Sequence, residues 1–168
     1  MKTKPQALVH PIPPLYNEDS RLLILGSFPS PKSREARFFY GHPQNRFWPL
    51  LARLLDEAPP QSVEEKATLA LSHHIALWDS IASCTIVGAS DSSVKDVKPN
   101  DLSGILHGSR VAHIACNGAL SYTMYMRHLF PATGIEAIRL PSTSPANAAF
   151  SMERLAEAWR VILPILDT

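Results

Sequence analysis

Apolar residues along the chain follow two spacings, which predict two kinds of element. Four short, mostly apolar segments, at 22–25, 75–78, 111–115 and 135–140, are predicted to be strands, and the continuous run at 22–25 is typical of a strand buried on both faces. Between them, apolar positions recur every three or four residues, as they do along one face of a helix. Because long helical crossovers place successive strands parallel, we predict a three-layer α/β/α sandwich with a mostly parallel four-stranded sheet.

The predicted helices have recognisable beginnings. The first starts near Phe47, and Ser62 and Glu65 have the spacing of a capping box that opens the second. A third helix is expected from the turn at 117–118 to about residue 129. The last helix is expected near the C-terminus, where apolar residues between 155 and 166 share one face.

Length and composition fit one globular domain. The chain has 168 residues, so we expect a single domain over 1–168, with a proline-rich lead at 1–20. The polar stretch after residue 78 is expected to hold only one short helix, at about 99–106. No apolar run approaches the roughly 18 residues that span a bilayer, and the N-terminus has no secretory pattern. These features predict a cytoplasmic protein with no membrane partner.

Neither cysteine belongs to a metal-binding or redox pattern. Cys84 and Cys116 have no Cys-x-x-Cys partner, so we predict no metal and expect both thiols to be buried. The net charge of +1 lacks the basic excess of strong nonspecific DNA binders. Composition alone therefore leaves the function open.

The segments after the predicted strands are where chemistry is expected, because ligands in open α/β sheets bind beyond the carboxyl ends of the strands. They read Gly-Ser-Phe-Pro-Ser from Gly26, Asp-Ser-Ile-Ala-Ser from Asp79, Cys-Asn-Gly from Cys116 and Pro-Ser-Thr-Ser-Pro from Pro141. A further segment, 38–48, crowds five aromatics, a histidine, an asparagine and an arginine into a turn broken by glycine and proline. Loops seldom hold so many aromatics without a function.

Three of these strings together resemble the uracil-DNA glycosylase superfamily. His-Pro-Gln-Asn-Arg-Phe-Trp at 42–48 is similar to the mismatch-specific uracil glycosylases. Ser-Phe-Pro-Ser at 27–30 and Pro-Ser-Thr-Ser-Pro at 141–145 are similar to the hypoxanthine-DNA glycosylases. The likeness runs from about residue 21 to 165 in the order of the family. It implies an α/β/α fold, a DNA partner that contains a deaminated base, most closely hypoxanthine, and no cofactor.

The resemblance implies roles for the first loops, with one departure. The family's water-orienting Asn or Asp falls on Phe28, whose ring cannot orient water. We expect Asn45 to position the water instead, with His42 as a polar neighbour or general base. The aromatic that stacks on the extruded base falls on Tyr40. Ser27 and Phe28 are expected to lie beside the base.

The resemblance also implies where the base edge is read. The family uses a polar residue at the end of the second strand, which is Asp79 here. Hypoxanthine carries an N1–H, which a carboxylate attracts, whereas the N1 lone pair of adenine is repelled. Alternatively, Asp79 only caps the polar segment after the strand. Asn117 is expected either to approach the base or a phosphate, or to serve as a plain helix cap.

DNA contacts are expected from the first and last loops. The last loop of the family commonly offers a His or Asn to the leaving base and a bulky wedge to the base stack, at positions filled here by Ser142 and Ala146. Hydroxyls and backbone N–H groups can still hold phosphates, and Asn147 or Phe150 can enter the stack. The residues expected to contact DNA are Ser30, Lys32, Ser142, Thr143, Ser144, Ala146 and Asn147.

The expected reaction is hydrolysis of the N-glycosidic bond of a flipped deoxyinosine, which gives hypoxanthine and an abasic site. No lysine lies in the matched strings 27–30, 42–48 and 141–145, so we expect attack by water rather than a Schiff base. One alternative is a mismatch-specific uracil or thymine glycosylase, favoured by the 42–48 string. Another is a non-catalytic binder of nucleic acid or nucleotide that kept the fold after losing the water activator at residue 28. We expect a monomer.

Overall fold

The computed structural model describes residues 6–86 and 94–167. Its centre is a four-stranded sheet in the order β3-β2-β6-β7, in which every neighbouring pair is parallel. The strands are β2 (Leu22–Gly26), β3 (Ile75–Asp79), β6 (His113–Asn117) and β7 (Ala137–Leu140). The predicted parallel sheet is therefore confirmed, although β6 and β7 each begin two residues later than the apolar pattern indicated.

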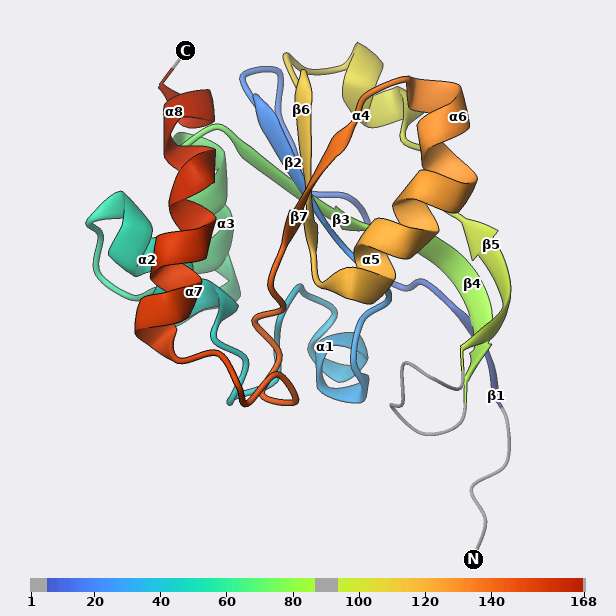
Figure 1. Cartoon of the computed structure of the whole chain (residues 1–168), viewed down its shortest axis with the longest axis horizontal. Coiled ribbons are helices and arrows are strands. Elements are labelled where there is room, and N and C mark those ends of the chain that lie inside the picture. Colours follow the sequence, from blue (N-terminus) through green and yellow to red (C-terminus); the bar gives the residue numbers. More distant parts are fainter. Residues whose placement is uncertain (1–5, 87–93, 168) are drawn as a thin grey trace, which may run out of the picture.

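Helices cover both faces of this sheet and complete the predicted sandwich (Figure 1). One face carries α2 (Phe47–Leu55), α3 (Val63–Ser72), α7 (Met152–Trp159), a 3₁₀ turn (Arg160–Ile162) and α8 (Leu163–Leu166). The other carries α4 (Ser103–His107), α5 (Ala119–Met124), a π-helix (Tyr125–Leu129) and α6 (Phe130–Thr133). Alternate strand residues separate the two cores, since Leu22 and Ile24 pack on the first set of helices whereas Leu23 and Leu25 pack on the second.

Local sequence explains how two of these helices begin and continue. The Ser62 hydroxyl accepts from the Glu65 N–H, and the Glu65 carboxylate accepts from the Ser62 N–H, so the predicted capping box is confirmed. The helix expected to end near residue 129 continues to Thr133 through a π-turn. Pro131 has no N–H to complete an α-helical bond with residue 127, which accounts for the wider turn.

A second sheet, which the sequence did not predict, adjoins the first. It is antiparallel, in the order β1-β4-β5, and consists of β1 (Gln6–Val9), β4 (Ile81–Ile86) and β5 (Lys95–Pro99). The prediction that this segment holds only one short helix was wrong, because it also forms β4 and β5. The sequence pattern does not reveal β4, since this strand is buried on one side only and shifts register against β5. From Gln6 on, the N-terminal lead is part of the fold, since β1 pairs with β4.

The two thiols are unpaired and buried, as predicted. Burial raises the pKa of the Cys84 thiol, and it raises the pKa of Cys116 to about 12. In the described ranges no three His, Cys, Asp or Glu side chains gather as a metal site would need. No helix within those same ranges is long and apolar enough to cross a bilayer.

The carboxyl ends of the parallel strands open on one side of the molecule. Figure 1 shows two segments there, α1 (Pro31–Ala36), which follows β2, and the loop that joins β7 to α7. The sequence predicted only a loop at α1, because a six-residue helix is too short to show a periodic apolar face. Ser30 begins this helix by accepting from the Ser33 N–H.

Candidate active site

A pocket of about 900 Å³ lies beyond the carboxyl ends of the parallel strands, within the range of small-molecule sites. Its walls come from the segments after β2, β3, β6 and β7 and from the loop before α2. The predicted site residues that line it are Ser27, Phe28, Ser30, Tyr40, His42, Asn45, Asp79, Asn117, Ser142, Thr143, Ser144, Ala146 and Asn147. Lys32 lies outside the pocket, exposed on α1 and 3.9 Å from the Glu35 carboxylate.

Asp79, at the carboxyl end of β3, supplies a buried carboxylate to the pocket. Its Oδ2 lies 2.6 Å from Nε2 of His10, and both side chains are almost completely buried. The Ile12 N–H donates to Nδ1 of the same ring, so Nδ1 carries no proton and we assign the imidazole proton to Nε2. The pair is therefore a neutral imidazole that donates to a carboxylate. Among the described residues, Asp79 Oδ1 has no hydrogen-bond partner.

Gly26, at the end of β2, leaves the space that the second carboxylate oxygen occupies. A Cβ at this position would overlap Asp79 Oδ1 and would lie 3.2 Å from the Tyr40 hydroxyl oxygen. The carboxylate and the phenol thus approach the same point at the end of the strand. Any side chain at residue 26 would displace one of them.

Tyr40 carries a buried hydroxyl that has no hydrogen-bond partner in the described structure. Burial, and then the negative charge of Asp79, raise the pKa of this hydroxyl, which keeps its proton. The Asn117 amide lowers this pKa. Its oxygen and one N–H of its NH₂ group are bonded to Thr143. The ring stacks on Phe47 with 4.0 Å between centroids, and its stacking on a base stays a prediction.

Asn45 and Asn117 are linked through Thr143. The Thr143 hydroxyl donates to Asn45 Oδ1 at 2.8 Å and accepts from Asn117 Nδ2 at 3.0 Å. Asn45 Oδ1 also accepts from the Phe47 N–H, so the free hydrogen-bonding group of Asn45 is its NH₂. Thr143 was expected to contact DNA, but it is completely buried and has no surface to offer a phosphate. Its observed contacts position the two amides.

The loop after β7 is held to the start of α2 by Arg46. The Arg46 guanidinium donates to the carbonyl oxygens of Ser144 at 2.9 Å, Asn147 at 3.0 Å and Phe150. Within the loop, the Ser142 hydroxyl accepts from the Ser144 N–H. These bonds fix the loop against the pocket. Because the Ser142 hydroxyl accepts in its bond, its own proton is still available as a donor. The expected DNA contacts of this loop stay predictions.

His42 lies at the pocket wall with one ring nitrogen engaged. The Gln44 N–H donates to its Nδ1 at 3.0 Å, so the network assigns the proton of a neutral ring to Nε2. In this state the ring is a donor through Nε2. For His42 to act as a base through Nδ1, its hydrogen bond with the Gln44 N–H would have to break. The polar-neighbour role is thus compatible with the geometry, and both roles stay predictions.

Two arginines line the pocket and are supported by aromatic rings. The guanidinium of Arg34 lies 5.8 Å from the centroid of Phe28, and that of Arg139, on β7, lies 5.9 Å from Tyr122. Neither forms an ion pair with a described residue. Such cations are available to a phosphate backbone even in a chain with a net charge of +1.

His10 is a site residue that the sequence did not predict. It lies directly after β1, in the segment expected to be a lead, and its partner is 69 residues away in the chain. The short apolar run Ala7-Leu8-Val9 before it is a weak strand signal that could have placed it in the fold. Nothing in the sequence indicates its pairing with Asp79.

Comparisons with known proteins identify the family. A family model described as the uracil DNA glycosylase superfamily matches residues 13–163. A protein of Methanosarcina acetivorans named hypoxanthine DNA glycosylase is 34% identical over 89% of this chain and 94% of its own length. One of the same name from Methanosarcina barkeri is 38% identical over 54% of this chain and 58% of its own. A solution NMR structure of a candidate uracil DNA glycosylase from Methanosarcina acetivorans superposes with a TM-score of 0.82 at 31% identity, over 97% of this chain and 100% of its own.

Proposed function

The chain belongs to the uracil DNA glycosylase superfamily, and on this premise we propose that it removes hypoxanthine from DNA by hydrolysing the N-glycosidic bond of deoxyinosine. The products are the free base and an abasic site. Both curated relatives are named hypoxanthine DNA glycosylase, which supports this choice of base. The structural observation that carries it is the free oxygen of Asp79 in the pocket.

Asp79 Oδ1 fits the one edge that deamination changes. Adenine has a lone pair at N1, whereas hypoxanthine has an N1–H next to the O6 carbonyl. An acceptor that is fixed in a buried position attracts the N–H and repels the lone pair, and such sites discriminate strongly between bases. Guanine carries the same N1–H, but its pair with cytosine resists extrusion more than a mispaired inosine does.

The polar groups of the pocket suit attack by water. No lysine lines the pocket in the described ranges, so a Schiff base has no support there. The NH₂ of Asn45 can hold the oxygen of a water, or donate to the purine as negative charge develops on it. Phe28 occupies the usual place of the water activator. Catalysis therefore relies on positioning, stacking and exclusion of water.

A base-release assay tests the proposal. Matched duplexes carry hypoxanthine, uracil, xanthine, mismatched thymine or no lesion, and abasic sites are revealed by alkaline cleavage under single-turnover conditions. The expected result is fastest cleavage of the hypoxanthine duplex and none of the undamaged one. Cleavage confined to uracil or mismatched thymine contradicts the choice of base, and binding without cleavage of any duplex contradicts the enzymatic assignment.

A mismatch-specific uracil or thymine glycosylase is the second candidate, and residues 42–48 are the observation that favours it. Uracil offers an N3–H between two carbonyls, so a carboxylate gains one bond and meets repulsion on both sides. We expect uracil to be a poorer substrate for this reason. We also propose that the protein acts in the cytoplasm and as a monomer. Size-exclusion chromatography with light scattering tests the monomeric state.

A further inference from the structure

His10 contacts the base-reading carboxylate from outside every motif that suggested a function. Its backbone N–H donates to the Ala82 carbonyl at 2.7 Å, which fixes the residue against β4, just beyond Asp79 in the chain. Its ring lies edge-on to Phe28 and Trp78, with centroids 5.7 Å and 6.1 Å away. These contacts bury the imidazole and leave its nitrogens facing two protein partners, Ile12 and Asp79.

Two hydrogen bonds and the open space at Gly26 orient the carboxylate. The Ile12 N–H fixes which nitrogen of His10 carries the proton, and that proton fixes Oδ2 of Asp79. The missing side chain of Gly26 leaves room for Oδ1. Rotation of the carboxylate would break the bond to His10. The single free oxygen is therefore held in one place at the end of β3.

We propose that His10 is a positioning residue for base selection, which holds Asp79 so that Oδ1 is the acceptor for the N1–H of hypoxanthine. This inference rests on the proposed function. A buried polar pair contributes little net stability compared with apolar residues of the same volume, so stability alone does not account for its presence in the pocket. A positioned acceptor that faces the substrate does account for it, because small displacements of a reading group greatly reduce the rate.

Three substitutions separate positioning from packing. His10→Gln keeps a donor at a reach similar to that of Nε2, whereas His10→Leu removes the donor and keeps an apolar side chain in the site. Asp79→Asn removes the carboxylate, and each His10 variant is also made in that background. Single-turnover release of hypoxanthine and of uracil is measured on otherwise identical duplexes, with thermal unfolding followed for every protein. If His10→Leu fails to fold, His10→Asn, which is too short to reach Oδ2, replaces it.

His10→Leu is expected to slow hypoxanthine release roughly ten- to hundredfold and to slow uracil release less, because the two bases use the acceptor differently. His10→Gln restores most of the lost rate. In the Asp79→Asn background, His10→Leu has little further effect. Equal losses on both bases, no advantage of Gln over Leu, or an undiminished loss in the Asp79→Asn background each overturn the positioning role. Failure of the unaltered chain to release hypoxanthine instead overturns the proposed function, and this inference with it.

Discussion

Replacing Tyr40 by phenylalanine removes one oxygen atom and should stabilise the fold. The Tyr40 hydroxyl is buried without a partner, and a buried hydroxyl that lacks a hydrogen bond costs about 1–3 kcal/mol. Its removal leaves the stack on Phe47 intact. For a chain of this size, about 1–2 kcal/mol corresponds to an increase of roughly 2–8 °C in Tm. Hypoxanthine release should change little in the same variant, because the ring that is predicted to stack on the base is kept.

Tyr125→Phe is the matched control. Tyr125 is also a buried tyrosine, but its hydroxyl bonds to the Thr133 hydroxyl at 2.6 Å and to the Ile135 carbonyl, and none of these three residues lines the pocket. Loss of these bonds should cost about 1–3 kcal/mol of stability and so lower Tm by a few degrees. Base release should be unchanged. Both variants are compared by calorimetry and by single-turnover release. If Tyr40→Phe lowers Tm as Tyr125→Phe does, the Tyr40 hydroxyl has a partner and the reasoning is wrong.

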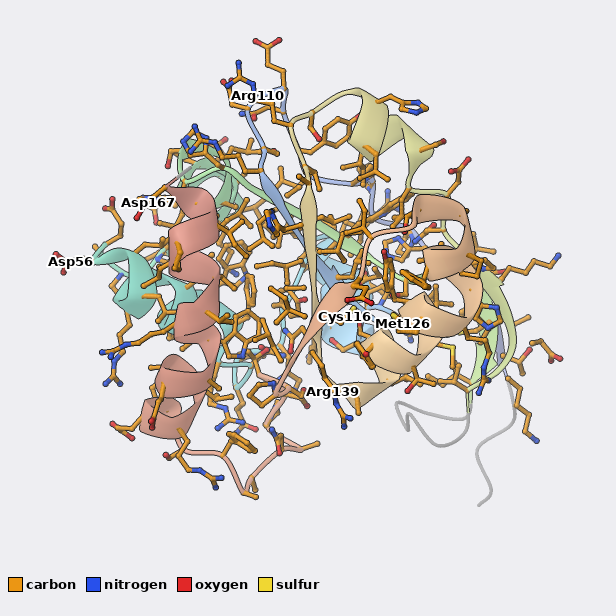
Figure 2. All side chains as sticks on the ribbon, turned by 45° about the horizontal axis from the view of Figure 1, so that its top comes forward. Asp56, Arg110, Cys116, Met126, Arg139 and Asp167 are labelled. Carbon is orange, nitrogen blue, oxygen red and sulfur yellow. The ribbon has the colours of Figure 1, made fainter. Side chains whose placement is uncertain are left out.

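Three further predictions concern other parts of the site. Asn45→Ala should slow base release by about a hundredfold or more in single-turnover assays. Asn45→Asp, which keeps the oxygen but replaces the NH₂, should be equally slow. A normal rate in Asn45→Asp would mean that the residue acts as an acceptor. Arg139→Gln should weaken DNA binding and reduce the slope of log affinity against log salt by about 1, whereas Arg110→Gln, at the opposite end of the molecule in Figure 2, should not. Gly26→Ala should abolish hypoxanthine release by displacing Asp79, and an active, folded variant would show that the carboxylate tolerates movement.

The parallel sheet could be predicted because its information is local. Runs such as Leu22 to Leu25 are buried on both faces and therefore apolar throughout, and the long crossovers between them leave few other topologies. The second sheet could not be predicted in the same way. In β4 only one side is buried, and its register shifts disturb the alternation that marks such strands. Its partner β1 is only four residues long.

The candidate site was predictable as a set of loops but not as a set of contacts. Motifs placed Asp79 at a strand end and Tyr40 and Asn45 in the segment before the helix at Phe47, and the structure brings them to one pocket. The sequence could not indicate that Thr143 is buried between two amides, or that His10, directly after β1, contacts Asp79. Such pairings depend on long-range packing, which no local pattern encodes.

The most direct test of the account is the ratio of hypoxanthine to uracil release, measured on the same duplex for the unaltered chain and for Asp79→Asn. An asparagine at this position can both accept from an N–H and donate to a carbonyl, so it suits uracil, whereas the carboxylate can only accept. Asp79→Asn, verified as folded, is expected to reduce hypoxanthine release and to leave uracil release equal or increased. A parallel loss on both bases would contradict it, because Asp79 would then support the loop without reading the base.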